Sequence, residues 1–560
     1  MSQSKLKSQF IEIIGKKNVL DDESETRKFC TGWRTGYGLV TFVLLPDNLK
    51  SMWEALKLCV ENDIIIIFQA ANTGLTGGST PNGSYDRQIV LINTSKLKKI
   101  HYLKKNKQVI CMPGSTLHEL ETLLKTHSRQ PHSVLGSSCI GASVVGGICN
   151  NSGGSLIQRG PAYTELSVFA QIDSNGRLNL INNSGIDLGS SPEEILLNLE
   201  KGNLSDKKIE KNNKKASDTE YSKIIRDIES STPSRYNADK RCLHESSGCA
   251  GKLAVFAVRL DTYPENKVEK VFYIGSNNTT NLTKIRKHIL KNFINLPVSA
   301  EYMHKDIFDI SEKYGKDTVL IIKWFGTKHL PYFFSLKGNF DTFFKKIKIF
   351  ENFSDRALQL FSNFFPPILP KKLFNYRKKY EHHLILKMSD EGIKEAESFL
   401  RKFFIKNEGD FFICNKKEGK MAELNRFAAA GAAVRYKKIF NDKVEDVLAL
   451  DFSLPRNEEY WFEELPDSLS DNFIYKLYYG HFFCHVLHQD YITKKGTNTV
   501  KLKDELLEIL DKRGAEYPAE HNVGHLYEAK TSLSDFYKRI DPTNSMNPGI
   551  GKTSKKKHYL

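Results

Sequence analysis

The stretch QAANTGLTGGSTPNG, residues 69–83, directly follows the apolar run DIIIIF at residues 63–68. A short β-branched run bounded by glycine and polar residues predicts a strand that ends in a tight turn. Glycine permits positive φ and lets backbone N–H groups approach a ligand closely. Successive exposed N–H groups form a nest that binds phosphate without a charged side chain. The stretch therefore predicts a pyrophosphate-binding turn, and the alternative for this stretch alone is an ordinary turn.

A second glycine-rich segment, GSSCIGASVVGGICNNSGG, covers residues 136–154 and contains six of the 36 glycines of the chain. Short β-rich runs such as VTFVLL (40–45) alternate here with helical stretches such as LKSMWEALKLCV (49–60). This alternation predicts a mixed α/β domain. Two candidate phosphate turns that bracket one α/β unit predict a nucleotide cofactor. The fingerprints G-x-G-x-x-G and G-x-x-x-x-G-K-[ST] are both absent from the sequence, which argues against a Rossmann-type helix and against a P-loop.

The composition limits where the protein can act. The 560 residues carry a net charge of +16, which favours an anionic partner such as a membrane surface, a nucleic acid or an acidic substrate. Nine cysteines without a CxxC pair argue against a disulfide framework or a zinc knuckle and favour reduced thiols in a cytosolic compartment. The start MSQSKLKSQF has no signal-peptide core. No run approaches the ~20 apolar residues of a spanning helix, so we expect any membrane contact to be peripheral.

One region combines basic and aromatic residues. Residues 328–380 contain 11 Lys or Arg, three acids and 11 of the 34 phenylalanines. Exposed phenylalanines among lysines suit an anionic bilayer surface, where aromatic rings enter the interface and lysines face lipid phosphates. The same composition could stack on single-stranded nucleic acid. It could also form a helical subdomain that buries its phenylalanines and has an incidental positive face.

The two glycine-rich segments resemble the FAD-binding half of the vanillyl-alcohol oxidase and p-cresol methylhydroxylase family. Five longer stretches resemble the bacterial quinone-dependent D-lactate dehydrogenases within that group: residues 131–165, 245–262, 479–492, 517–527 and 541–555. The similarity spans nearly the whole chain. It implies FAD as the cofactor, and it assigns the FAD contacts to the following residues. They are Ala70, Ala71, Asn72, Thr73, Gly74, Gly78, Ser79, Gly136, Ser143, Gly153 and Val255.

The resemblance also implies the architecture. The fold would be α+β, with a two-part FAD-binding domain of the p-cresol methylhydroxylase type and a cap domain that has an antiparallel sheet. The FAD-binding domain would cover residues 1–268, with a core at about 36–206 and a solvated charged loop at 201–223. The cap would cover residues 269–514 and include a helical, basic, membrane-contacting insertion at about 328–380. Residues 515–560 would return to the FAD domain.

Oxidation of a 2-hydroxy acid needs a base for the hydroxyl proton and a cation or donors for the carboxylate. Histidines cluster at residues 381–383, 480–489 and 519–525. In related 2-hydroxy-acid dehydrogenases a G-H-x-G-D-G-N-x-H segment and an E-H-G-x-G segment meet over the flavin. Here His481 and His488 keep the seven-residue spacing of the first segment, and Glu520 with His521 keeps the second. We expect His521 to be the general base, because an imidazole titrates near neutral pH.

Two further assignments concern a metal site and the partner of the substrate carboxylate. In the relatives the two spaced histidines and the glutamate can hold a divalent metal, and here these would be His481, His488 and Glu520. The central G-D-G-N is replaced, so we expect no metal. Arg435 is our candidate partner of the substrate carboxylate, because a guanidinium binds carboxylate bidentately, and Arg426 is its competitor. An ordinary ion pair is the alternative for either arginine.

The resemblance implies that D-lactate is oxidised to pyruvate through FAD, with electrons passed to membrane quinone. It implies a peripheral location on the cytoplasmic side of the inner membrane, contact with an anionic membrane surface through residues 328–380, and no nucleic-acid partner. Two alternatives stay open. One is a dehydrogenase of another D-2-hydroxy acid, such as 2-hydroxyglutarate or glycolate. The other is a non-catalytic basic protein that docks on membranes or nucleic acid and has a degenerate flavin fold.

Overall fold

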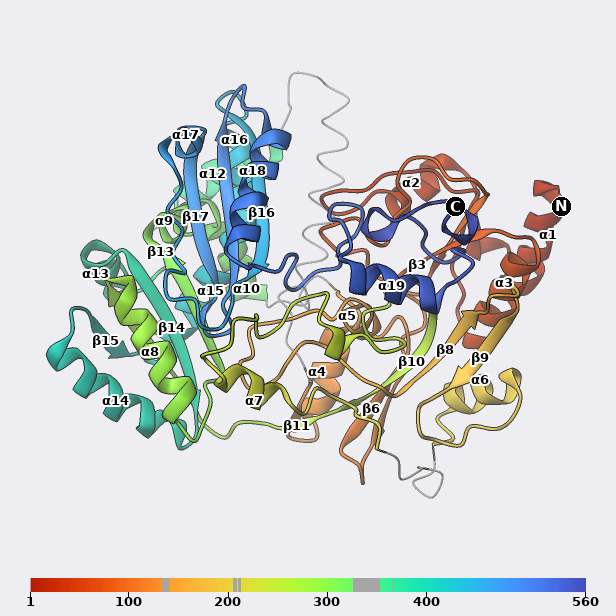
Figure 1. Ribbon diagram of the computed structural model, residues 1–560, viewed down its shortest axis with the longest axis horizontal. Coiled ribbons are helices and arrows are strands. Elements are labelled where there is room, and N and C mark those ends of the chain that lie inside the picture. The colour runs from red at the N-terminus through yellow and green to blue at the C-terminus, as the bar shows by residue number, and fades with distance from the viewer. Residues whose placement is uncertain (1, 133–140, 205–208, 210–212, 326–352, 366) are drawn as a thin grey trace.

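The computed structural model describes residues 2–132, 141–204, 209, 213–325, 353–365 and 367–560. They form two lobes that lie side by side, and both labelled ends of the chain lie in the same lobe (Figure 1). Residues from about 269 to 512 build the other lobe. Helices and sheets occur in both lobes, so the chain has the α+β organisation that the resemblance implies.

The first lobe starts with a small sheet in the order β1-β2-β4-β3. Its strands β2, β4 and β3 are parallel, and β1 is antiparallel to β2. Parallel strands need a crossover connection, and helix α3 supplies it between β2 and β3, which lie on either side of β4. The elements are α1 (Gln3–Ile14), β1 (Val19–Leu20), α2 (Glu23–Cys30), β2 (Phe42–Leu44), α3 (Leu49–Glu61), β3 (Ile65–Gln69) and β4 (Ile89–Asn93).

Residues from the far end of the sequence extend this sheet. Met546 forms a parallel bridge with Ile66 of β3. The amide of Ile66 donates to Ser545 at 2.9 Å, and the amide of Asn547 donates to Ile66 at 2.8 Å. The short segment 545–547 therefore satisfies backbone groups at the open edge of β3, beside the turn that follows the strand.

A second sheet in this lobe is antiparallel throughout, in the order β5-β6-β10-β8-β9. Its strands are β5 (Ile100–Leu103), β6 (Gln108–Cys111), β8 (Ser167–Ile172), β9 (Leu178–Asn182) and β10 (Ala254–Asp261). Around it lie α4 (Leu117–Lys125), β7 (Arg129–Gln130), α5 (Val144–Cys149), α6 (Pro192–Lys201), β11 (Tyr263–Pro264) and α19 (Thr531–Ile540). Helix α7 (Tyr221–Arg226) instead buries Tyr221 and Ile225 in a core of the second lobe. Buried residues of α4, α5 and α19 share one apolar core with β10.

The second lobe is built on a seven-stranded sheet in the order β15-β12-β14-β13-β17-β18-β16, in which every pairing is antiparallel. The strands are β12 (Glu269–Ser276), β13 (Ser299–His304), β14 (His382–Ser389), β15 (Asp410–Ile413), β16 (Val444–Ser453), β17 (Phe473–His481) and β18 (Val486–Lys494). The expected antiparallel cap sheet is confirmed.

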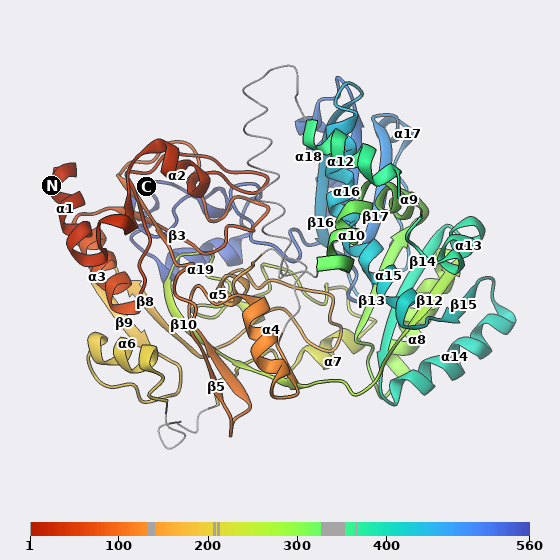
Figure 2. The ribbon, with the colours of Figure 1, turned by 180° about the vertical axis from the view of Figure 1, so that it is seen from behind.

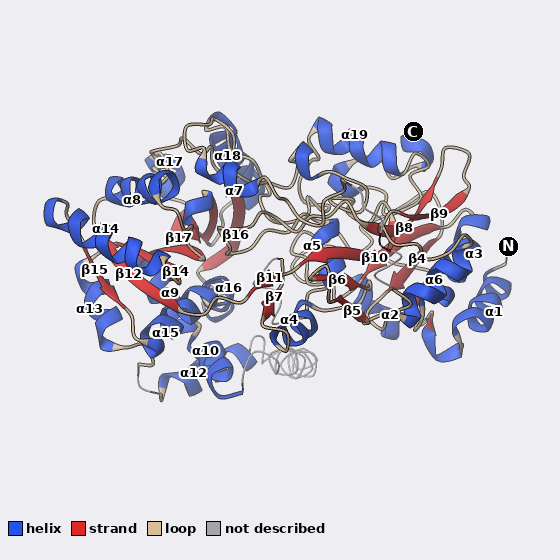
Figure 3. Ribbon diagram, turned by 90° about the horizontal axis from the view of Figure 1, so that it is seen from below, coloured by secondary structure: helices blue, strands red, loops and turns tan. Residues whose placement is uncertain are grey.

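Helices cover both faces of this sheet (Figure 3). Successive strand residues point to opposite faces, so Phe272 and Ile274 join one core while Val271 and Tyr273 join the other. The first core includes α8 (Thr279–Asn292), α14 (Gly392–Lys406) and α18 (Thr499–Lys512). The second includes α9 (Lys305–Tyr314), α15 (Lys416–Phe427) and α16 (Ala429–Ile439). The short helix α17 (Asp467–Ser470) lies between β16 and β17.

Three further helices belong to the basic region of the sequence or border it: α10 (Lys316–Phe325), α12 (Phe353–Asn363) and α13 (Lys371–Lys379). Seen from behind, α10 and α12 lie with α9 and α16 on one side of the lobe (Figure 2). Residues 326–352, and with them much of the expected insertion, lie outside the described residues. Within the described ranges, no helix is long and apolar enough to cross a membrane.

Two local expectations can be compared with the structure. The charged stretch 201–223 was expected to be a solvated loop, but helix α7 begins at Tyr221, whose side chain is fully buried. Ala216 and Ser217 are buried as well, so the expectation of a solvated loop fails for the second half of the stretch. Every cysteine in the described ranges is free.

Candidate active site

The turn after β3 exposes a row of backbone donors. Asn72 has a positive φ of 53°, and its side-chain amide donates to Thr31 at 2.8 Å. The hydroxyl of Ser79 donates to Asn72 at 3.0 Å, which closes the turn. In the part of the chain that the structure describes, no backbone N–H of residues 70–79 donates to another protein group. A Cβ on Gly74 would meet nothing within 4 Å. The turn thus offers an open nest of N–H groups of the kind that a diphosphate needs.

The second glycine-rich segment approaches the first through one loop. Ser143 caps α5 by accepting from the amide of Gly146 at 2.9 Å. The loop 519–525 touches both segments. A side chain on Gly78 would collide with Asn522, and one on Gly153 would collide with Glu520. These two glycines are therefore needed for the close approach of the loop.

The two remaining residues that we expected to contact FAD are Val255 and Gly136. Val255 is buried in β10 opposite Phe169 of β8, close to the bulge in that pairing. Gly136 lies outside the described residues.

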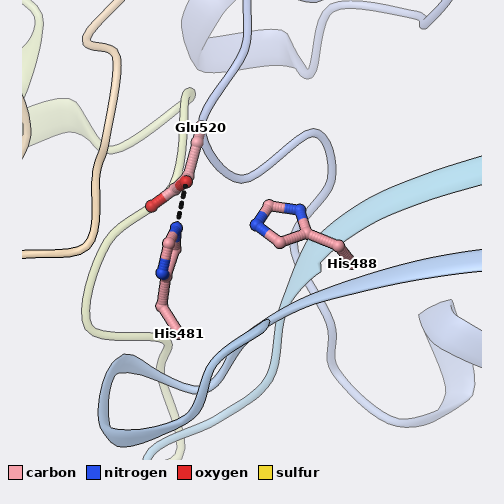
Figure 4. A group of neighbouring side chains, drawn as sticks. All are labelled: His481, His488 and Glu520. Carbon is pink, nitrogen blue, oxygen red and sulfur yellow. Dashed lines mark ion pairs between the residues drawn. The ribbon is translucent and has the colours of Figure 1, made fainter. Parts of the chain in front are cut away.

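Two histidines and a glutamate meet at the junction of the lobes. The end of β17 carries His481, and the adjacent antiparallel strand β18 carries His488. Glu520 reaches them from the loop 519–525. One ligand atom from each of the three side chains lies within 4.8 Å of the others, and His481 Nε2 lies 3.2 Å from Glu520 Oε2 (Figure 4). The geometry that three metal ligands require is therefore present, although the sequence argued against a metal.

A chain of charges surrounds His481. Glu301, directly opposite on β13, lies 2.6 Å from His481 Nδ1 and also pairs with Arg426 Nε at 2.9 Å. Arg235 pairs with Glu520 at 2.6 Å. Burial disfavours the imidazolium, but Glu301 and Glu520 outweigh it and raise the pKa of His481 to about 10. Burial also opposes ionisation of Glu520, yet His481 and Arg235 hold its pKa well below the usual range.

The other two imidazoles share a different carboxylate. Asp451 of β16 lies opposite His488 in the strand register, with Oδ1 at 3.2 Å from His488 Nδ1. Its other oxygen lies 3.7 Å from His521 Nε2 and accepts a hydrogen bond from the backbone amide of Glu520 at 2.9 Å. The side chain of His521 is 35% exposed, whereas those of His481 and His488 are 12% and 18% exposed. Among these three histidines, His521 is the most accessible to a substrate.

The structure does not bring Arg435 to this cluster. Its guanidinium is buried between Asp317 and Asp355, with Nε 3.3 Å from the latter, so its charge is already compensated inside the helical layer. The position of Arg435 therefore corrects our assignment of it to the substrate carboxylate. Its competitor Arg426 does reach the cluster, through Glu301.

The remaining histidine groups have structural contacts. His382 is 2.7 Å from the hydroxyl of Tyr302, and His485 contacts the carbonyl of Pro455 at 2.9 Å. His525 contacts the carbonyl of Thr80 at 3.0 Å and so holds the loop 519–525 against the cofactor turn. The three histidine clusters of the sequence therefore contain more histidines than the site itself.

The sequence reasoning missed several charged residues of the site: Arg34, Arg235, Glu301, Asp451 and Asp490. Three of them carried a usable signal, because Glu301, Asp451 and Asp490 interrupt apolar strands in SAEYM, LALDFS and HQDYI. Burial raises the pKa of Asp490, which accepts from the hydroxyl of Tyr479 at 2.8 Å. Arg34 is exposed, and its charge partly offsets that shift.

Comparisons with known proteins agree with this arrangement. The model of an FAD binding domain matches residues 40–178, and the model described as D-lactate dehydrogenase, membrane binding, matches residues 271–559. The chain is 55% identical over 554 residues to the quinone-dependent D-lactate dehydrogenase of Escherichia coli (strain K12), covering 99% of this chain and 97% of that protein. It is 53% identical to the enzyme of the same name from Haemophilus influenzae (strain ATCC 51907 / DSM 11121 / KW20 / Rd), over the full length of both.

A solved structure supports the fold. The p-cresol methylhydroxylase structure with substrate bound aligns with a TM-score of 0.59 at 12% identity, covering 98% of this chain and 97% of that one. The expected fold class, the resemblance and the FAD cofactor are thus confirmed. The chain belongs to the quinone-dependent D-lactate dehydrogenase family, in which an FAD-binding domain is joined to a membrane-binding domain.

Proposed function

We propose that the protein oxidises D-lactate to pyruvate and passes the electrons to a membrane quinone. The observation that carries this proposal is the loop 519–525, which places Asn522 against Gly78 and Glu520 against Gly153, one contact in each glycine-rich segment, with His521 between these two residues in sequence. When bound, FAD supplies the two-electron acceptor that the oxidation needs. The names of the relatives supply the substrate, its handedness and the quinone.

The residues of the chain divide the remaining work. His521 would take the hydroxyl proton of the substrate, since it is accessible and its Nε2 faces Asp451. His481, His488 and Glu520 would hold a divalent cation if one binds, and they would otherwise form a polar wall around the substrate. Arg426, which pairs with Glu301, and Arg34, whose charge lowers the pKa of Asp490, would balance a substrate carboxylate.

For the cofactor we propose the contacts expected from the sequence. The diphosphate would lie on the N–H groups of Ala70–Gly74, with Gly78 and Ser79 completing the turn. Ser143, Gly153 and Val255 would line the rest of the cofactor, together with Gly136. We also propose the division into residues 1–268, 269–514 and 515–560, which is supported by the bridge from Met546 back to β3.

The experiment for this function is an anaerobic visible spectrum of the purified protein before and after addition of D-lactate, with L-lactate as the control. We expect a flavin band that bleaches with D-lactate alone. A band that stays oxidised with both would redirect the search to 2-hydroxyglutarate and glycolate. A protein that shows no flavin band even after addition of FAD would contradict the enzyme assignment.

We further propose that the membrane contact lies on α10, α12 and α13 and favours anionic lipids. Large apolar side chains are exposed there: Trp324 at 54%, Phe361 at 62% and Phe364 at 79%. The adjacent helix α13 has the sequence KKLFNYRKK, which contains five basic residues and no acid. Aromatic rings and lysines on one surface suit the headgroup region of an anionic bilayer. From its membership of this family, we propose that the protein binds the cytoplasmic face of the cell membrane.

A pair of charge-matched variants tests this surface. One changes Lys371, Lys372 and Lys378 of α13 to Glu, and the control changes Lys394, Lys402 and Lys406 of α14 to Glu; all six lysines are exposed. We expect the α13 variant to lose sedimentation with vesicles that contain anionic lipid, while the control keeps it. Equal loss in both variants would indicate attraction by net charge alone. Unchanged binding of the α13 variant would refute the assignment.

A further inference from the structure

Asp451 is a buried carboxylate that faces the site from β16 and has no counterpart in the histidine motifs. Its side chain contacts three groups: His488 Nδ1 at 3.2 Å, His521 Nε2 at 3.7 Å and the backbone N–H of Glu520 at 2.9 Å. Its backbone carbonyl also accepts from the amide of Ala519 at 3.2 Å. One residue thus holds both a strand histidine and the loop that carries Glu520 and His521.

Among the described residues, Asp451 is the carboxylate that lies within ion-pair distance of both His488 and His521. The connection between His481 and His488, residues 482–487, contains no acid. Glu301 contacts Nδ1 of His481, and Glu520 contacts Nε2 of the same ring. His488 and His521 are left with Asp451, which lies directly opposite His488 because β16 and β18 pair in antiparallel register.

The contacts hold the two rings in different ways. Asp451 lies 3.2 Å from Nδ1 of His488, and the other nitrogen of that ring points toward His481 and Glu520 (Figure 4). Asp451 lies 3.7 Å from Nε2 of His521, beyond hydrogen-bond distance, so its contact with this ring is electrostatic. A carboxylate that accepts from one ring nitrogen of a histidine fixes both the tautomer and the ring orientation, and such partners are worth about 10- to 100-fold in affinity or activity.

We infer that Asp451 is a positioning residue that orients His488 and His521 together and so sets the geometry of the base and of a candidate metal ligand through one carboxylate. This inference rests on the proposed function for the role of His521. The part that concerns His488 does not depend on the substrate.

The test compares Asp451→Asn with Glu463→Gln. Glu463 is a matched control, because it is a buried acid of the same lobe that binds the hydroxyls of Tyr478 and Tyr491 and no histidine. The first readout is the rate of anaerobic flavin reduction by D-lactate in the FAD-loaded protein. We expect Asp451→Asn to lower this rate by about 10- to 100-fold with little change in KM. We expect Glu463→Gln to stay near the rate of the unchanged protein.

The second readout separates positioning from general damage. In a protein that already carries His521→Ala, adding Asp451→Asn should lower the rate by less than about threefold, because residues that act as a unit are non-additive. A full 10- to 100-fold further loss in that background would overturn the inference, as would an equal loss in Glu463→Gln. If Asp451→Asn does not retain FAD, Asp451→Glu takes its place, since it keeps the charge and shifts the carboxylate by one methylene.

The third readout needs no turnover. Zn²⁺ binding to the unchanged protein and to the variants is measured by competition with a fluorescent chelator. We expect Asp451→Asn to weaken it about 10-fold or more and Glu463→Gln to leave it unchanged. If D-lactate does not reduce the unchanged protein, the proposed substrate fails while this readout still tests His488. Unchanged Zn²⁺ affinity in Asp451→Asn together with an unchanged reduction rate would refute the role of Asp451.

Discussion

His521 is the residue on which the proposed proton transfer depends. Its side chain is partly exposed. The preceding residue in the loop, Glu520, has its side chain against Gly153. We expect His521→Ala to retain FAD and to reduce flavin at a rate about 10²- to 10⁴-fold lower, because a positioned general base contributes that much. Stopped-flow absorbance under anaerobic conditions measures the rate. His288→Ala, an exposed histidine of α8, is the control, and near-normal reduction by the His521 variant would remove it from the role.

Arg435 is expected to act on stability. Replacing it by Gln leaves Asp317 and Asp355 without their guanidinium in a buried layer. Breaking such a pair costs about 3–5 kcal/mol. We therefore expect Arg435→Gln to unfold at a lower temperature and to keep its KM for D-lactate, whereas Arg426→Gln should change the kinetics. A raised KM in Arg435→Gln with unchanged melting would restore the original assignment.

At the scale of single residues, the sequence predicts the site only in part. His481, His488, Glu520 and His521 could be found because each stands in a short motif whose spacing survives. Glu301 and Asp451 stand out as acids in apolar strands, but neither they nor Arg235 could be assigned to the site from the sequence. Each comes from a separate strand or loop and meets the motifs only through sheet register or lobe contact. Arg435 was assigned to the substrate carboxylate because the sequence does not show whether an arginine in a helix faces a substrate or two aspartates.

At the scale of elements, strand β14 contains a pH-sensitive position. His383 is buried beside Tyr273 and Phe308, and burial lowers its pKa to about 3. An ordinary histidine takes up its proton near pH 6.5, so between these values the unfolded chain binds more protons than the folded one. Stability is therefore full above about pH 6.5 and is lost as the pH falls, by roughly 2 kcal/mol at pH 5 from this residue alone.

We expect His383→Leu to lose less stability than the unchanged protein between pH 7 and pH 5. Urea midpoints at the two pH values measure the difference. His127→Leu, at an exposed position after α4, should keep the acid sensitivity of the unchanged protein. An identical pH dependence in His383→Leu would show that other groups dominate the acid response.

Most elements were predictable where a local pattern was strong. The run 49–60 becomes α3, which begins after Asn48 because the side chain of that residue caps the amide of Ser51. The run 63–68 becomes β3, shifted by one or two residues. The start of α7 could not be found, because its first buried residue, Tyr221, stands among charged neighbours. The edge segment 545–547 has no apolar alternation and forms only because β3 offers it an edge.

At the scale of the whole molecule, Asn547 joins parts that are far apart in sequence. Its side-chain amide donates to Gly78 at 2.8 Å and to Ala250 at 2.7 Å, so it ties the cofactor turn to the second sheet. Losing two buried hydrogen bonds at about 1 kcal/mol each should weaken FAD binding by about tenfold or more. We expect Asn547→Ala to release FAD on dilution, measured by flavin fluorescence. Asn175→Ala, in an exposed turn, should not, and equal retention of FAD by both variants would contradict the role of Asn547.

The bridge between Ile66 and Met546 also orders events during synthesis. The two residues are 480 positions apart, so β3 leaves the ribosome long before its edge partner exists. At roughly 5–20 residues per second this interval is on the order of half a minute to a minute and a half. During it, the strand that leads into the cofactor turn has an open edge, available to chaperones or to neighbouring nascent chains. We therefore expect chains that end before residue 545 to leave the edge of β3 without this partner.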